Sequence, residues 1–122
     1  MADTTIASVE TALGFRLPND YREFLSGNNG GEGFVGKHYL IAWRVEELIP
    51  FNRDYQVNEY APGILIFASS GGGEAFAFDT RDDIWPVVQV PFIGLDLDSA
   101  IKVADTFFDL LSKMSYSDES LI

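Results

Sequence analysis

The strongest constraint on the fold is a run of strand-like segments between residues 63 and 92. Residues 63–68 (GILIFA) are mostly apolar, and residues 74–79 (EAFAFD) place phenylalanine at every second position. The Ser-Ser-Gly-Gly-Gly sequence at 69–73 joins the two segments, and such a turn favours a β-hairpin. A charged turn at 80–83 leads to residues 85–92, whose two prolines indicate an edge strand or pairing interrupted at its ends. The pattern predicts an antiparallel meander.

Helical patterns occur at both ends of the chain. Apolar residues recur at helical spacing in residues 6–13, 17–25 and 101–114. Asp98 or Ser99 suits the first position of the last of these helices, because short polar side chains cap helix N-termini. The sequence therefore predicts two helices before the strands and one after them.

The region between the second helix and the meander is mixed. Residues 34–43 carry aromatic and branched side chains and predict strands around a turn near Gly36. Residues 45–49 predict a short helix that stops at or before Pro50, because the residue before a proline disfavours helical geometry. Residues 51–60 are expected to be irregular.

These elements predict an α+β domain that spans residues 1–122. The helices at the two termini are expected to pack on one face of an antiparallel or mixed sheet that is curved or open on its other face. A length of 122 residues corresponds to one ordinary domain, and 47% hydrophobic residues are enough to build its core. A partly uncovered sheet face would offer a binding surface.

Acidic residues outnumber basic ones along the whole chain. The sequence has 19 Asp and Glu against 8 Lys and Arg, which gives a formal net charge of -11. This balance argues against nucleic acid and anionic membranes as partners, because both bind basic surfaces. A basic protein partner fits the charge, and so does the simpler interpretation that negative charge keeps a small protein soluble.

The sequence shows neither cysteine chemistry nor a membrane segment. Because cysteine is absent, the chain forms no disulfide, thiolate metal site or cysteine nucleophile. No apolar run approaches the roughly 18–20 residues of a membrane span. The residues after Met1 lack the positive region of a signal peptide. We expect a cytoplasmic location.

Residues that could form an active site are scarce. His38 is the one histidine and lies in a predicted strand, where a structural role is the simpler interpretation. Neither Ser69 nor Ser70 has a glycine two places before it, as a nucleophile elbow requires. The three glycines at 71–73 are followed by Glu74, whereas a phosphate-binding loop continues with Lys and Ser or Thr. We expect no enzymatic activity and no cofactor.

Acidic turns do not change this expectation. Asp79, Asp82 and Asp83 fall in one turn and Asp96 and Asp98 in another, but neither has the spacing of an EF-hand. Aspartate is common in turns because it bonds its own backbone. We therefore expect no metal site. An enzyme acting on glycans or small polar molecules remains a third hypothesis, resting only on the abundance of carboxylates and aromatic rings.

Aromatic side chains in the strand and loop regions stand near acidic ones in the sequence. These aromatic residues are Phe34, Tyr39, Trp43, Tyr55, Tyr60 and Trp85. Aromatic anchors surrounded by acids would bind a basic partner, whereas burial of the rings and solvation of the acids would explain the same composition. The candidate interface residues are Glu46, Glu47, Asp82, Asp83, Trp85, Asp96 and Asp98.

Short motifs follow one another along nearly the whole chain. They are Leu13-Gly14-Phe15, Leu17-Pro18-Asn19-Asp20-Tyr21-Arg22-Glu23-Phe24-Leu25, Asn29-Gly30-Gly31, Trp43-Arg44-Val45-Glu46-Glu47-Leu48, Ile64-Leu65-Ile66-Phe67-Ala68, Gly72-Gly73-Glu74-Ala75-Phe76-Ala77-Phe78-Asp79, Trp85-Pro86-Val87-Val88 and Ala104-Asp105-Thr106-Phe107-Phe108-Asp109-Leu110-Leu111. In this order and spacing they resemble the SUKH superfamily, and within it the branch related to the yeast Smi/Knr cell-wall regulators.

The resemblance implies a SUKH-like α+β domain that binds proteins and has no known catalytic centre. Bacterial members look like immunity proteins that neutralise polymorphic toxins, often nucleases, whereas fungal relatives are scaffolding regulators of cell-wall synthesis. The small size of the chain fits the bacterial type. The leading expectation is an immunity-type protein whose partner is a basic toxin domain. The alternative is an intracellular scaffold or regulator, and the oligomeric state stays open.

Overall fold

The computed structural model describes residues 3–27, 30–35, 38–70, 73–81, 85–92 and 95–116. The N-terminal elements are α1 (Asp3–Leu13), α2 (Asn19–Gly27), β1 (Gly31–Val35) and β2 (His38–Ala42). The middle of the chain forms the 3-10 turn η1 (Val45–Glu47), α3 (Leu48–Asp54), α4 (Val57–Tyr60), β3 (Ile64–Ser69) and β4 (Glu74–Asp79). The last elements are β5 (Val87–Pro91), the 3-10 turn η2 (Leu97–Ser99), β6 (Ile101–Ala104) and α5 (Phe107–Tyr116).

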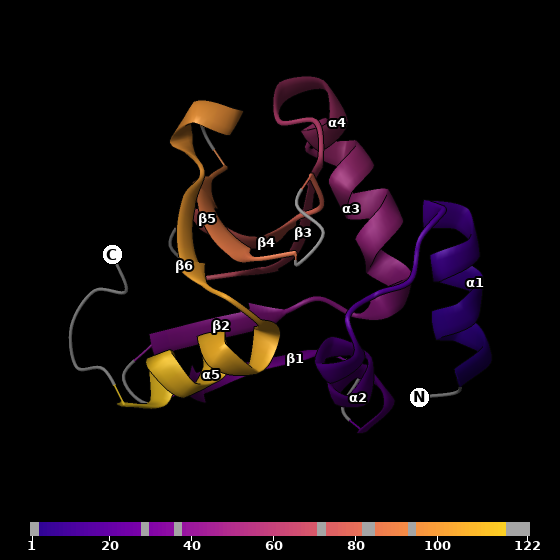
Figure 1. The fold of residues 1–122 in the computed structure, drawn as a ribbon, viewed down its shortest axis with the longest axis horizontal. Helices are drawn as coiled ribbons and strands as arrows, with labels where there is room; N and C mark the ends of the chain where they lie inside the picture. Colours follow the sequence, from indigo (N-terminus) through magenta and orange to yellow (C-terminus); the bar gives the residue numbers. More distant parts are fainter. Residues whose placement is uncertain are drawn as a thin grey trace.

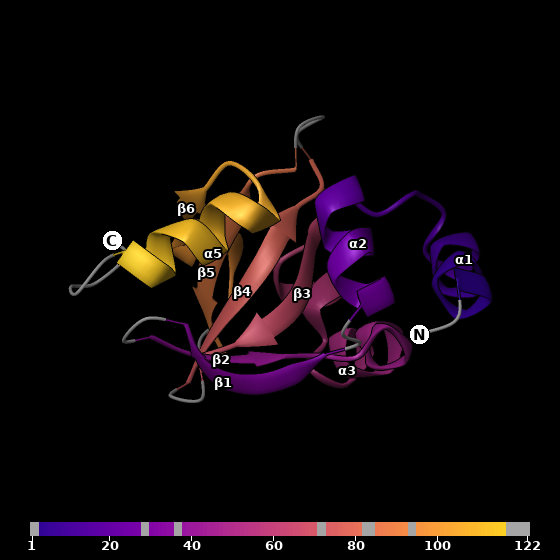
Figure 2. The same cartoon turned by 90° about the horizontal axis from the view of Figure 1, so that it is seen from below.

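The strands form one sheet of six strands in the order β1-β2-β3-β4-β5-β6, and each neighbouring pair is antiparallel. Helices α2 and α5 contact each other and lie over one face of the sheet, with α1 beside α2 (Figure 1, Figure 2). The predicted α+β architecture is thus confirmed, with N-terminal and C-terminal helices on a curved antiparallel sheet. The predicted hairpin between residues 63 and 79 is β3–β4.

Aromatic rings fill the space between the two helices and the sheet. The ring centroid of Tyr21 on α2 lies 5.3 Å from that of Phe67, 5.2 Å from Phe78 and 5.1 Å from Phe107 on α5. All four side chains are fully buried, and Phe67 and Phe78 stack at 4.4 Å. Burial of this much aromatic surface is the main force that holds the helices on the sheet.

The central strands are buried on both faces, so of the two expected alternatives the sheet at β3 and β4 is curved rather than open. Every residue of β3 is buried, as are the four inner residues of β4. Helices α3 and α4 contact β3 and add Leu48 and Val57 to the same core. The curl of the sheet also brings the end of β5 towards the residue after β2. The ring centroids of Trp43 and Phe92 lie only 6.5 Å apart.

The Asn52 side chain of α3 takes the place of a strand along part of the edge of β3. Strand β2 pairs with β3 only through Ile41–Ser69 and Ala42–Ala68. Farther along β3, the Asn52 carboxamide donates to the carbonyl of Ile66 (2.9 Å) and accepts from its N–H (2.9 Å). Both backbone groups of Ile66 are therefore satisfied without a neighbouring strand.

Residues 101–104 correct the predicted start of the last helix. They form β6, and α5 begins only at Phe107. The β-branched side chains of Ile101 and Val103 suit a strand. Thr106 supplies the real helix start, because its hydroxyl accepts the N–H of Asp109 at 3.0 Å. The apolar residues of this strand and of the helix after it have the spacing of a single helix, which is why the sequence predicted one.

The region after β2 is more helical than expected. Helix α3 runs through Pro50, which lies in its first turn, where a missing N–H costs no helical hydrogen bond. Residues 51–60, expected to be irregular, belong mostly to α3 and α4. Strand β5 is an interior strand, and its prolines stand just before its start and at its last residue, as the interrupted-end interpretation allowed.

Candidate interaction surfaces

The structure does not bring the described members of the predicted interface set together. Asp82 and Asp83 lie outside the described residues. Trp85 belongs to the connection between β4 and β5, whereas Asp96 and Asp98 belong to that between β5 and β6. These connections leave opposite ends of β5, so their residues are separated by the length of a strand. Glu46 and Glu47 are in η1, between β2 and α3 (Figure 1).

Two of the predicted acids have structural roles. The Glu47 carboxylate accepts the backbone N–H of Arg44 at 2.8 Å at the start of η1. The Asp96 carboxylate accepts the backbone N–H of Ser99 at 2.8 Å and so caps η2. Such bonds satisfy donors that a helical turn leaves without partners. Glu46 and Asp98 are exposed on the same two turns.

Trp85 is part of a half-exposed aromatic pair. Its ring meets that of Phe15 edge-on at 4.8 Å and lies 5.9 Å from the buried ring of Phe78. Its backbone has φ of 54°, in the left-handed region that side chains other than glycine rarely adopt. The Trp85 indole thus covers the end of the aromatic core and is only partly available at the surface.

Ion pairs occupy several of the basic side chains. Arg22 pairs with Glu10, Arg81 with Asp79, Lys102 with Asp105 and Lys113 with Asp109. The Arg81 side chain donates to Asp79 and lowers the pKa of that carboxyl. The backbone N–H of Asp105 and the nearby lysines lower the pKa of Asp109. Because acids exceed bases 19 to 8, these pairs leave a surplus of negative charge.

The outer side of the β1–β2 hairpin carries the strongly exposed ring of Phe34 beside the half-buried side chains of Tyr39 and Ile41. We call it the hairpin face and define it as Glu32, Phe34, Tyr39 and Ile41, which share one side of the two strands. Phe34 is 73% exposed, and its ring meets the Tyr39 ring at 5.1 Å. The residues that alternate with Tyr39 and Ile41, Leu40 and Ala42, are buried.

A hydrogen bond fixes the polar part of the hairpin face. The Tyr39 hydroxyl donates to Oε2 of Glu32 at 2.5 Å. This bond to the carboxylate raises the pKa of the Tyr39 hydroxyl, with smaller contributions from desolvation and from the charge of Glu32. Phe34 and Tyr39 were among the aromatic residues noted in the sequence, whereas Glu32 was not predicted. The alternation of Glu32 and Phe34 with glycine is the period-two signal that could have identified it.

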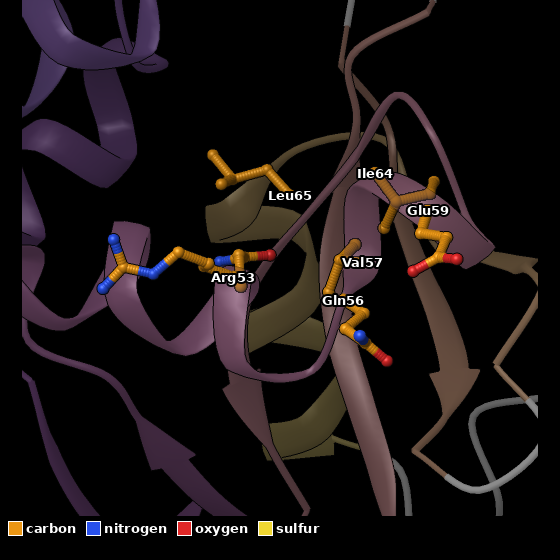
Figure 3. A pocket seen from close by; sticks show the side chains of 7 residues that line it. Arg53, Gln56, Val57, Glu59, Ile64 and Leu65 are labelled. Carbon is orange, nitrogen blue, oxygen red and sulfur yellow. The ribbon is translucent and has the colours of Figure 1, made fainter.

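A second feature is a cavity of about 400 Å³ between α3, α4 and β3 (Figure 3). It is lined by Asn52, Arg53, Gln56, Val57, Glu59, Ile64 and Leu65. The Arg53 guanidinium points away from Val57 and Ile64, and the Glu59 carboxylate lies on the other side of them (Figure 3). The Asn52 amide is already bonded to Ile66. The lining residues therefore do not converge on a reacting centre.

Two kinds of functional feature are absent from the described residues. Within the ranges given above, no group of three or more His, Cys, Asp or Glu side chains is arranged to hold a metal ion. No helix among these residues is both long and apolar enough to cross a membrane.

Comparison with known proteins adds the identity of the fold. The model of the SMI1 / KNR4 family (SUKH-1) matches residues 2–113. The chain belongs to this family. It is also similar to YnaB of Bacillus subtilis (strain 168), with 28% identity over 116 residues, covering 90% of this chain and 75% of YnaB. The family match confirms the resemblance drawn from the motifs.

In this SMI1/KNR4 chain the motif residues build the scaffold. Leu17 and Tyr21 are fully buried in the core. Between them, the Asp20 carboxylate accepts the N–H of Phe108 at 3.1 Å and so ties α2 to the first turn of α5. Gly30 has φ of 82°, and a Cβ there would meet backbone atoms at 2.9 Å. The motif therefore specifies packing and helix capping.

Proposed function

We propose that the chain is a non-enzymatic, immunity-type protein that neutralises a cognate toxin, such as a nuclease, by binding it inside the cell. Membership of the SMI1/KNR4 (SUKH-1) family carries this proposal. The exposed Phe34 ring of the hairpin face supports it, and so does the surplus of acidic over basic residues in the sequence.

The charge argument explains why a nuclease is a suitable target. A nuclease binds polyanionic nucleic acid through a basic groove. An acidic inhibitor is attracted to that groove before contact, which raises its association rate, and its acids then compete with the nucleic acid phosphates. Asp98, which is exposed, is proposed to contribute to this attraction together with the predicted acids Asp82 and Asp83, and Trp85 is proposed to contribute to the contact itself.

Affinity capture of the tagged protein from its native cells, followed by mass spectrometry and a growth-rescue assay, tests the proposal. We expect one basic toxin domain whose lethality is relieved when this chain is co-expressed. A tagged acidic domain of unrelated fold controls for capture by charge alone. Recovery of several cell-envelope proteins without rescue would favour the alternative, a scaffold or regulator linked to the cell wall.

The attraction is tested separately by stopped-flow association at increasing salt. We expect the association rate with the toxin domain to fall about tenfold or more between low and high ionic strength, because salt screens long-range attraction. Asp82→Lys with Asp83→Lys, and separately Asp98→Lys, should reduce the rate at low salt. Asp98→Asn is the matched control for loss of charge without reversal. A rate insensitive to salt would refute the steering argument.

A further inference from the structure

Strand β1 lies at one edge of the described sheet. Among the described strands, β1 pairs only with β2, so its other side is an open edge. The pairing runs from Gly31 opposite Ala42 to Val35 opposite His38 without a register shift. Natural edge strands are commonly protected by lysine, proline, a bulge or another charged side chain, and in β1 (GEGFV) the only charge is that of Glu32. This edge therefore leaves room for a partner beside Glu32.

The hairpin face adds an anchor and a charge to this edge. Helices α2 and α5 cover the other side of the sheet (Figure 2). The Phe34 side chain is 73% exposed. The Tyr39 hydroxyl orients the Glu32 carboxylate through Oε2. Oxygen Oε1 of Glu32 has no partner among the described residues and can accept a hydrogen bond from an incoming lysine or arginine. Neither β1 nor β2 contains a lysine or arginine of its own.

We propose that the hairpin face is the surface on which this protein docks a basic protein partner, with Phe34 as the apolar anchor and Glu32 as the acceptor for a cationic side chain. The inference rests on the proposed function and names its contact surface. Charge complementarity favours a basic protein over a second copy of this chain as the occupant. A second copy would bring two chains of net charge -11 together and place their Glu32 carboxylates on the same interface.

The hairpin face and the dispersed acids have different kinetic roles. Long-range attraction by surface acids raises the association rate, whereas a buried aromatic anchor slows dissociation. Aromatic residues that fill a pocket on the partner typically dominate binding energy. Removing the Phe34 ring should therefore weaken the affinity about 30-fold, mainly through faster dissociation. Removing the charge of Glu32 should weaken it about fivefold.

The variants Phe34→Thr and Glu32→Gln test the inference against the purified basic toxin domain recovered by the capture. Threonine has the β-branched shape that strands favour, so we expect the fold to be retained. The matched control is Phe108→Thr, which removes an aromatic ring of 46% exposure from α5, on the covered side of the sheet. Surface plasmon resonance gives both rate constants, and urea unfolding checks that each variant is folded.

Faster dissociation in Phe34→Thr with unchanged binding in Phe108→Thr would support the inference. If Phe34→Thr and Phe108→Thr both bound the toxin domain with the wild-type affinity and growth rescue were intact, the inference would be overturned and the proposed function would stand. Absence of any rescuing toxin would instead refute the proposed function. Sedimentation of the protein alone tests the other occupant: a dimer at micromolar concentration that Phe34→Thr dissociates would show that the hairpin face binds a second copy, and would overturn the basic-partner assignment.

Discussion

The hydroxyl of Tyr21 is buried without a hydrogen-bond partner among the described residues. Phe67, Phe78 and Phe107 surround its ring, and burial raises the pKa of the hydroxyl far above its usual range. A buried polar group without a partner costs about 1–3 kcal/mol of folding free energy. Tyr21→Phe removes the hydroxyl and keeps the ring, so we expect the free energy of unfolding to rise by about 1 kcal/mol.

Chemical and thermal unfolding measure this change. For 122 residues, an unfolding entropy of about 2.1 cal/mol/K per residue converts 1 kcal/mol into a rise in Tm of about 4 °C. The urea m-value should stay constant, because the buried surface is the same. Tyr60→Phe is the matched control, since Tyr60 is 52% exposed and its hydroxyl reaches water. A loss of 1 kcal/mol or more in Tyr21→Phe would refute the reasoning, because it would require a bonded hydroxyl.

Three further predictions concern contacts that hold the scaffold. Asp20→Ala removes the acceptor for the N–H of Phe108 at the start of α5 and should destabilise the protein by about 1–2 kcal/mol in urea unfolding, with Asp20→Asn losing less. Gly63→Ala places a Cβ 2.5 Å from Cγ of Arg81 at φ of 90° and should lower Tm measurably by calorimetry. The bond from Arg81 lowers the pKa of Asp79, so the stabilisation by its carboxylate is present at neutral pH and is lost as the pH falls below about 4. The free energies of unfolding of the wild type and Asp79→Asn, measured across pH, should therefore converge in acid.

The sequence predicted elements well where a local signal stood alone. Helix α1 ends at Gly14, whose φ of 88° is the left-handed geometry expected of a helix stop. The β3–β4 hairpin followed from the alternation of Phe76 and Phe78 beside a glycine-rich turn. At residues 101–104 the apolar residues fit both a strand and a helix. Pairing with β5 decides between them, and pairing depends on residues distant in the sequence.

The candidate site was harder to predict, because exposure and partners are tertiary facts. Glu47 and Asp96 looked like surface acids, but each accepts a backbone N–H in its own turn. Phe34 looked like one of many aromatic residues, and only the position of α2 and α5 determines that its side of the hairpin stays uncovered. Asn52, which bonds both backbone groups of Ile66, carried no sequence signal at all.

The motif residues and the hairpin face occupy separate parts of the chain, and this separation has a consequence for recognition. The motifs that identify the family stop at Gly31 and resume at Trp43, so the hairpin face lies in the gap between them. Leu17 and Tyr21 fill the core and Asp20 joins two helices, whereas Phe34 contributes little buried area within the chain itself. The docking proposal therefore predicts that a substitution at Phe34 changes partner binding with little effect on stability, while a substitution in the motif affects the scaffold first. If the hairpin face is the docking surface, substitutions on two adjacent strands are enough to change the partner. The other strands and helices pack together without a partner on this face.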